Sequence, residues 1–167
     1  MSKAYIALGS NLAGDLDGPA DQIKRAFLAL EKLPNTTLVA QSSLYQSVPI
    51  GYDAQPDFIN PDFINAVAEL NTFEMPKSLL KALLKIEQAF GRERPFANAP
   101  RVLDLDLLLY DDMKMQTKML TLPHPRMWDR AFVMLPLAEI APDLTAPNGD
   151  NIVKYAQQLK NQAITKI

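Results

Sequence analysis

Two aspartates, Asp104 and Asp106, stand two positions apart inside an apolar segment that spans residues 102–110. Successive side chains of a strand point to opposite faces, so the two carboxylates would share one face, roughly 7 Å apart at about 3.3 Å of rise per residue. Like charges at that distance repel, and burial adds a desolvation cost. A divalent cation shared with a polyphosphate would offset both, and Mg²⁺, which prefers oxygen ligands, is the natural candidate. The alternative is that both acids face water on a half-exposed strand.

The neighbours of the two acids favour the first interpretation. Arg101 precedes the segment and would stand at the mouth of the site, where a guanidinium can pair with phosphate oxygens. Leu108 would lie on the same face of the strand as the two aspartates. The period of two predicts that the other face is built from Leu103, Leu105, Leu107 and Leu109.

Composition limits the kind of partner. The chain has 167 residues, the size of one ordinary domain, and we expect a single domain over residues 1–167. A net charge of −2 provides no broad basic surface for nucleic acid, so phosphate must be met by local arginines. The chain contains no cysteine, which excludes disulfides, thiolate nucleophiles and Cys-ligated zinc. No leader or long apolar run is present, so we expect a cytoplasmic protein without a membrane segment. We also expect a monomer.

Apolar periodicity and the positions of proline and glycine predict the elements that position these residues. Strands are expected over residues 4–8, 36–48, 65–70 and 102–110, and a hairpin partner of the last over 115–122. Helices are expected over residues 19–33, 76–90, 127–140 with an interruption at Pro136, and 152–159. The order βαββαβ is typical of a ferredoxin-like α+β sandwich, here with additional C-terminal helices.

Two long irregular segments, residues 50–64 and 92–100, separate these elements. Loops of this length in a compact domain are usually functional or mobile. The first contains a tandem duplication, in which Pro56–Asn60 is repeated at once as Pro61–Asn65. The unit is far too short for a solenoid repeat, and we interpret it as an insertion in the loop.

Glu87 lies at the edge of the apolar stripe of the second predicted helix. It stands four residues after Leu83 and seven after Leu80, so it emerges on or beside the buried face. The simple interpretation is a helix-edge acid that touches solvent.

Four segments together are similar to one enzyme family: Gly9–Leu12, Asp62–Ala66, Arg101–Asp106 and Leu122–Arg126. The chain resembles 6-hydroxymethyl-7,8-dihydropterin pyrophosphokinase of folate synthesis, from about residue 4 to residue 144. The resemblance implies that the primary alcohol of the pterin attacks the β-phosphorus of ATP, giving the pterin diphosphate and AMP. It also implies that Asp104 and Asp106 hold two Mg²⁺ ions that are bound together with ATP.

The resemblance assigns further side chains to ATP. Arg92 and Arg101 correspond to arginines on the transferred phosphates, and His124 corresponds to a histidine that contacts phosphate. The other residues implied on the ATP side are Glu87, Arg94 and Arg130.

A pterin is flat and has a guanidine-like edge, which suits recognition by stacking and by an amide. The resemblance implies stacking by Phe63 and Phe132 and pairing of the edge with Asn65. Backbone groups near three residues would complete the recognition of that edge: Ser47, Val48 and Ile50.

The duplication leaves two candidates for this role, because Phe58 and Asn60 occupy the same positions in the first copy. We favour the second copy, since it adjoins the apolar run Ala66–Ala68, as in the family.

Two other classes of function fit parts of this pattern. One is a ferredoxin-like module that binds a nucleotide or metal without catalysis, since that fold hosts many binding proteins. The other is a two-metal phosphodiesterase, which also uses paired carboxylates, but the charge of the chain disfavours a nucleic-acid substrate. Reaction products discriminate between them: AMP with pterin diphosphate, no turnover, or nucleotide fragments.

Overall fold

The computed structural model describes residues 1–10, 18–47, 63–91, 103–146, 149–159, 161–162 and 164–167. Within these residues the strands are β1 (Ser2–Ser10), β2 (Thr36–Gln41), β3 (Tyr45–Ser47), β4 (Phe63–Thr72), β5 (Asp104–Tyr110), β6 (Met115–Gln116), β7 (Thr121–Leu122) and β8 (Ile164–Lys166). The helices are α1 (Pro19–Glu31), α2 (Pro76–Ala89), the 3-10 turn η1 (Met127–Asp129), α3 (Ala131–Ile140) and α4 (Ile152–Gln158).

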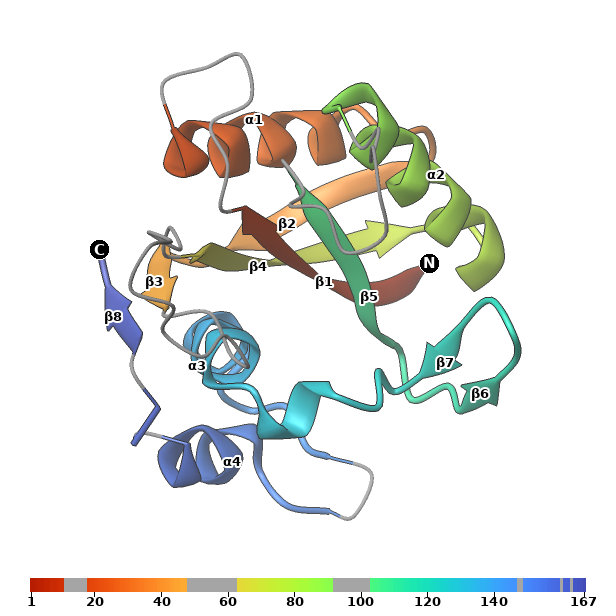
Figure 1. Cartoon of the computed structure of the whole chain (residues 1–167). Coiled ribbons are helices and arrows are strands. Elements are labelled where there is room, and N and C mark those ends of the chain that lie inside the picture. Colours follow the sequence, from red (N-terminus) through yellow and green to blue (C-terminus); the bar gives the residue numbers. More distant parts are fainter. Residues whose placement is uncertain (11–17, 48–62, 92–102, 147–148, 160, 163) are drawn as a thin grey trace.

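The main sheet is antiparallel, and its strands follow the order β5-β1-β4-β3-β8, with β2 also pairing with β4. Helices α1 and α2 cover one face of this sheet, and α3 and α4 lie on the other face (Figure 1). The element order and the sheet confirm the predicted ferredoxin-like sandwich with additional C-terminal helices. Strand β5, which carries the two aspartates, is an edge strand of the described sheet.

Each face of the sheet has its own apolar core. The core under α1 and α2 includes Ile6, Leu8, Phe27 and Leu83, and the core under α3 and α4 includes Met134 and Leu137. No helix in the described part of the chain combines the length and the apolar character needed to cross a bilayer.

A bulge in β5 changes the predicted alternation at one position. Ile6 of β1 pairs with Leu107 while Tyr5 pairs with Leu109, so Leu108 is the extra residue in β5. Leu103, Leu105 and Leu107 lie in the core under α1 and α2, as predicted. Leu109 does not join them: both Leu108 and Leu109 pack in the core on the α3 side. The prediction for Leu109 was therefore wrong, because the bulge shifts the alternation by one residue.

The predicted hairpin partner of β5 was also wrong. Residues 115–122 turn back on themselves, and β6 and β7 pair with each other in a separate two-stranded sheet. The reason is local, since Thr117 and Leu120 close the turn: the N–H of Thr117 donates to the carbonyl of Leu120 at 2.9 Å, and the hydroxyl of Thr117 accepts from the N–H of Leu120 at 3.1 Å.

Three other element predictions require correction. Helix α3 continues through Pro136, which removes only one backbone hydrogen bond; the interruption falls at Arg130, whose backbone is extended. The strand expected over residues 36–48 divides into β2 and β3. Both pair with β4, but the register shifts by one residue between them, since Gln41 faces Ala68 and Tyr45 faces Asn65. Strand β8 was not predicted, since three residues carry too little pattern.

Glu139 joins α3 to β3 and to the segment that precedes β3. Its carboxylate accepts hydrogen bonds from the Tyr45 hydroxyl at 2.6 Å and from the Ser43 N–H at 3.0 Å and hydroxyl at 2.9 Å. Burial by itself would raise the pKa of Glu139, but these bonds and the nearby Lys166 outweigh it and hold the pKa below its ordinary value. Because α3 carries Phe132 and β3 carries Ser47, this contact helps to fix the two walls of the candidate site described below.

We predict that Glu139→Ala lowers the free energy of unfolding at pH 7 by about 1 to 2 kcal/mol, since hydrogen bonds to a charged group are lost at a partly exposed site. Because the pKa of Glu139 is lower in the folded protein than in the unfolded chain, the ionised carboxylate stabilises the fold. This stabilisation is complete at pH values above the unfolded-state pKa and is lost as the pH falls through the folded-state pKa. Urea unfolding at neutral and acidic pH measures it, with Glu31→Ala, an exposed acid at the end of α1, as the control. An equal deficit at both pH values would contradict the assignment.

Candidate active site

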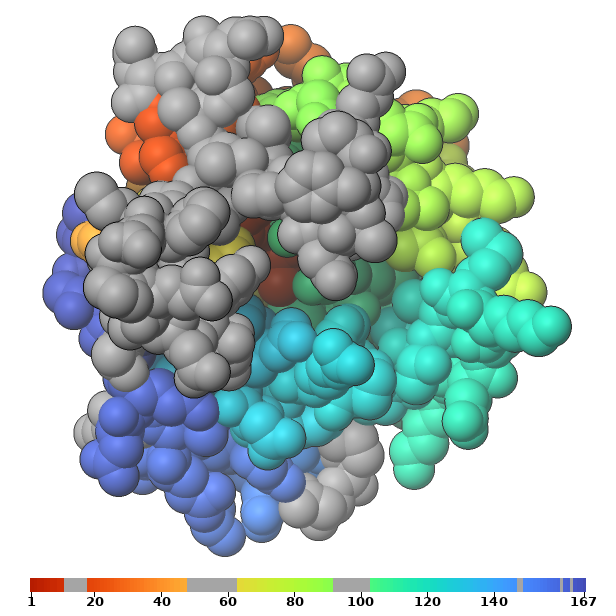
Figure 2. Space-filling model, in the orientation of Figure 1, coloured from red at the N-terminus to blue at the C-terminus, as the bar shows by residue number. Residues whose placement is uncertain are grey.

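A pocket of about 430 Å³ lies on the α3 side of the sheet. Residues from β1, β3, β4, β5 and α3 line it, together with Arg126 and Arg130, which flank η1. Figure 2 shows atoms of β1 and β5 at the bottom of a hollow in the middle of the view, between the two helical layers.

The two aspartates form one wall of the pocket. Asp104 pairs across the sheet with Gly9, and Asp106 pairs with Ala7. Both carboxylates are half-buried and both line the pocket, so the same-face geometry predicted from their spacing is confirmed. The small residues opposite them leave room above the strands. The two acids are therefore neither fully solvated nor enclosed, and they border a cavity that can receive a cation and its ligand.

Asn65 forms a second wall, and its amide is held in one orientation. The side chain is 4% exposed, and its Nδ2 donates to the Ser47 hydroxyl at 2.8 Å. Its Oδ1 lies over Gly9, where an added Cβ would approach to 3.2 Å. The glycine thus provides the space that the amide oxygen occupies. Asn65 and Gly9 both line the pocket, so an acceptor oxygen stands at this wall, which suits a ligand edge that carries N–H donors.

Two aromatic rings complete the apolar part of the pocket. Phe63 begins β4 and Phe132 lies in the first turn of α3, and both are half-buried pocket residues. The guanidinium of Arg130 lies over the Phe132 ring, 5.4 Å from its centroid. Such a contact restrains both side chains. The pocket therefore offers flat apolar surfaces beside the amide of Asn65.

His124 is held beside the acidic wall by its backbone. The extra residue of the β5 bulge, Leu108, accepts a hydrogen bond from the His124 N–H at 2.9 Å. The ring Nδ1 accepts from the Arg126 N–H at 3.2 Å, so the neutral ring carries its proton on Nε2. Burial lowers the pKa of His124; Asp106 acts in the opposite direction, and Arg130 and Arg126 lower it further. A neutral imidazole with an Nε2 proton can donate to an anionic ligand.

Most of the site residues predicted from the sequence and described by the structure converge here. The pocket is lined by Ser47, Phe63, Asn65, Asp104, Asp106, Arg130 and Phe132. The predicted residues outside the described part of the chain are Val48, Ile50, Arg92, Arg94 and Arg101, and the competing Phe58 and Asn60 also lie outside it.

Two functional candidates were missed by sequence reasoning. Arg126 and Gly9 line the pocket, although no role was assigned to either. Each belongs to a segment that carried the family resemblance, and that position was the available signal.

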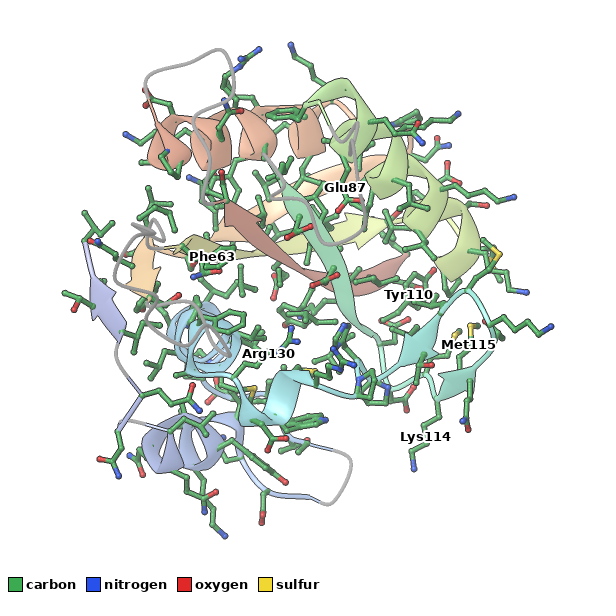
Figure 3. The ribbon with its side chains drawn as sticks, in the orientation of Figure 1. Phe63, Glu87, Tyr110, Lys114, Met115 and Arg130 are labelled. Carbon is green, nitrogen blue, oxygen red and sulfur yellow. The ribbon has the colours of Figure 1, made fainter. Side chains whose placement is uncertain are left out.

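Glu87 takes a place that the simple interpretation did not anticipate. It is 3% exposed rather than solvent-facing, and its Oε2 accepts a hydrogen bond from the Leu105 N–H at 2.8 Å. The side chain lies on the α2 side of the sheet, whereas Arg130 lies on the α3 side (Figure 3). It is not among the residues that line the pocket.

This sandwich and the acidic, cationic and aromatic walls of its pocket define an enzyme that transfers a phosphate-containing group. Comparisons with known proteins narrow that class. The family model of 7,8-dihydro-6-hydroxymethylpterin-pyrophosphokinase (HPPK) matches residues 5–142. The chain belongs to the HPPK family, whose members are pyrophosphokinases.

Two relatives illustrate the match. The 2-amino-4-hydroxy-6-hydroxymethyldihydropteridine pyrophosphokinase of Haemophilus influenzae is 42% identical over 167 residues, which are 100% of this chain and 99% of the relative. The enzyme of that name from Pseudomonas aeruginosa is 45% identical over 152 residues, 91% of this chain and 88% of the relative.

Solved structures agree with the fold. A variant of Plasmodium falciparum HPPK-DHPS aligns with a TM-score of 0.74 at 15% identity, covering 99% of this chain and 49% of the other. An HPPK-DHPS in complex with substrates gives a TM-score of 0.72 at 14% identity, covering 94% and 43%. The chain spans about half the length of these solved chains.

We predict that His124 titrates below the ordinary histidine pKa of about 6.5. It is the single histidine of the chain, so one imidazole signal in an NMR titration reports it. Asp106→Asn should lower the pKa further, since it removes a charge that favours the imidazolium, and Arg130→Met should raise it. A midpoint above the ordinary value, or shifts of the reverse sign in the two variants, would contradict this arrangement.

Proposed function

We propose that this pocket binds ATP together with 6-hydroxymethyl-7,8-dihydropterin and transfers the terminal diphosphate of ATP to the pterin, a step of folate biosynthesis. A bond forms between the hydroxymethyl oxygen and the β-phosphorus, and the bond from that phosphorus to the oxygen bridging to the α-phosphorus breaks. AMP leaves with the bridging oxygen, and the alcohol gives up its proton. One observation carries the proposal: the acidic wall and the aromatic and amide walls border the same pocket.

The pterin would occupy the part of the pocket between Phe63 and Phe132. Their rings provide stacking surfaces, and the Oδ1 of Asn65 accepts from the N–H groups of the pterin edge. Ser47 keeps the amide in the orientation that this requires. Backbone groups near Ser47, Val48 and Ile50 are proposed to complete the recognition of that edge.

The polyphosphate would lie over Asp104 and Asp106. Two carboxylates on one strand face fit Mg²⁺, which is commonly bound by one or two carboxylates together with substrate phosphates and water. We propose two ions at this wall. Bound there, Mg²⁺ would neutralise polyphosphate charge and acidify an alcohol that it contacts. The aspartates hold and orient this charge, so that ATP is presented to the pterin in line.

Cationic and donor groups complete the phosphate side. The Nε2 proton of His124 and the guanidinium groups of Arg126 and Arg130 can donate to phosphate oxygens. From the family resemblance we further propose Arg92 and Arg101 on the transferred phosphates. Arg94 is proposed as another residue on the ATP side. We also propose that a monomer is the active unit and that it acts in the cytoplasm.

Replacing either aspartate tests the phosphate side of the pocket. Asp104→Ala and Asp106→Ala should each lower the rate of AMP and pterin diphosphate formation by about 10²-fold or more, because part of the charge-stabilising clamp is lost. The melting temperature should stay level or rise, since each change removes same-face repulsion. Asp112→Ala, at an exposed acid in the turn after β5, is the matched control. Wild-type rates for both pocket variants in saturating Mg²⁺ would refute the assignment.

The duplicated segment gives a second test. Asn65→Ala should weaken pterin binding by about ten- to a hundredfold, because a buried amide that pairs with the ligand is lost. Asn60→Ala and deletion of residues 56–60 should both leave pterin affinity near normal. Calorimetry with the pterin and a non-hydrolysable ATP analogue measures each. If Asn60→Ala strongly weakened pterin binding while Asn65→Ala left the affinity unchanged, the first copy would be the one that binds the pterin.

A further inference from the structure

Glu87 is buried against the strand that carries the two aspartates, and the pocket chemistry leaves it unexplained. We propose that Glu87 is a positioning residue, which fixes the edge of β5 and thereby holds Asp104 and Asp106 at the spacing and direction that a metal–polyphosphate ligand requires. The inference rests on the proposed function of the pocket. It goes beyond that function because it assigns the control of metal-site geometry to a side chain on the opposite side of the sheet.

The edge position of β5 creates the need for such a residue. Strand β1 pairs with one side of β5, and β5 is the last strand in the order of the described sheet. The N–H and C=O groups on the outer side of an edge strand require other partners. At Leu105, between the two aspartates, the N–H donates to the Oε2 of Glu87 at 2.8 Å.

The environment makes this hydrogen bond a strong constraint. Both Glu87 and Leu105 are 3% exposed. A buried polar group is costly unless it is hydrogen-bonded, so this bond satisfies both the Leu105 N–H and an oxygen of Glu87 where water is excluded. The Leu105 side chain is also part of the core under α1 and α2. Leu105 is therefore held by its side chain and by its backbone.

Fixing Leu105 fixes its neighbours. Alternation sends the side chains of Asp104 and Asp106 to the pocket side, while Leu105 faces the core on the α2 side. Glu87 lies on that same α2 side (Figure 3). We therefore assign its action to the backbone of β5 and not to contact with a ligand in the pocket, whose lining does not include Glu87.

Supporting residues of this kind have measurable effects at metal sites. Loss of a hydrogen-bonding partner behind the ligands typically lowers metal affinity or activity about 10- to 100-fold. The partner needs the correct reach and an acceptor atom, whereas the net charge is secondary. This separates a positioning role from an electrostatic role and from direct contact with ATP.

Three variants of Glu87 distinguish these roles. Glu87→Gln keeps both the length and an acceptor oxygen, Glu87→Asp keeps the charge but shortens the reach, and Glu87→Ala removes both. Gln88→Ala, at the exposed neighbouring position of α2, is the matched control. For each folded variant we would measure the Mn²⁺ affinity in the presence of a non-hydrolysable ATP analogue, the amide exchange rate of Leu105 and the melting temperature.

We expect the Gln variant and the control to match wild type in Mn²⁺ affinity and in slow Leu105 exchange. The Asp and Ala variants should bind Mn²⁺ about 10- to 100-fold more weakly and should exchange the Leu105 amide faster. The proposal is overturned if Gln is as impaired as Ala while Asp is normal, because charge would then be the requirement. It is also overturned if Asp and Ala lower only the melting temperature. Failure of the pocket assignment itself would appear separately, as unchanged Mn²⁺ affinity in Asp104→Asn and Asp106→Asn.

Discussion

Repulsion between two half-buried carboxylates on one strand face is the constraint around which this molecule is arranged. Asp104 and Asp106 would be easier to accommodate if they faced bulk water or opposite sides of the sheet. Instead they border a pocket whose other walls carry two arginines, an amide and two aromatic rings, and small residues stand opposite them in β1. In the proposed function, a bound cation and a polyphosphate would offset this repulsion. This is how preorganised charge contributes to group transfer, because the protein need not rearrange at the moment of reaction.

The edge strand supplies the geometry for this arrangement. A bulge at Leu108 frees a carbonyl that binds the backbone of His124, which brings the imidazole to the acidic wall. One bond from α2 to Leu105 holds the segment between the two acids. On the other side, Glu139 ties α3 to the β2–β3 junction and so relates the wall of Phe132 to the wall of Asn65. Three contacts between segments that are distant in the sequence thus help to shape one pocket: Leu108 with His124, Glu87 with Leu105, and Glu139 with Tyr45.

The fold was predictable where periodicity is strong. The stripe of α2 and the alternation of Leu103 to Leu107 were correct because single elements bury single faces. Leu109 could not be placed, since a bulge depends on pairing with β1 and leaves no local signal. Strand spacing predicted the shared face of the acids, whereas the convergence of Asn65 and Phe132 needed the family resemblance. The spacing put Glu87 on or beside the buried face of its helix, but its hydrogen bond to Leu105 could not be predicted, because that bond depends on how α2 packs against β5.

The central claim is that one pocket holds metal-bound polyphosphate at the acids and the pterin at the rings. The most direct test is a crystal structure of the protein with Mn²⁺, a non-hydrolysable ATP analogue and the pterin. An anomalous difference map would locate the manganese. The account predicts manganese in contact with Asp104 and Asp106 and with phosphate oxygens. It also predicts the pterin between Phe63 and Phe132, with Asn65 on its edge. Manganese bound away from both aspartates, or a pterin outside this pocket, would contradict the account.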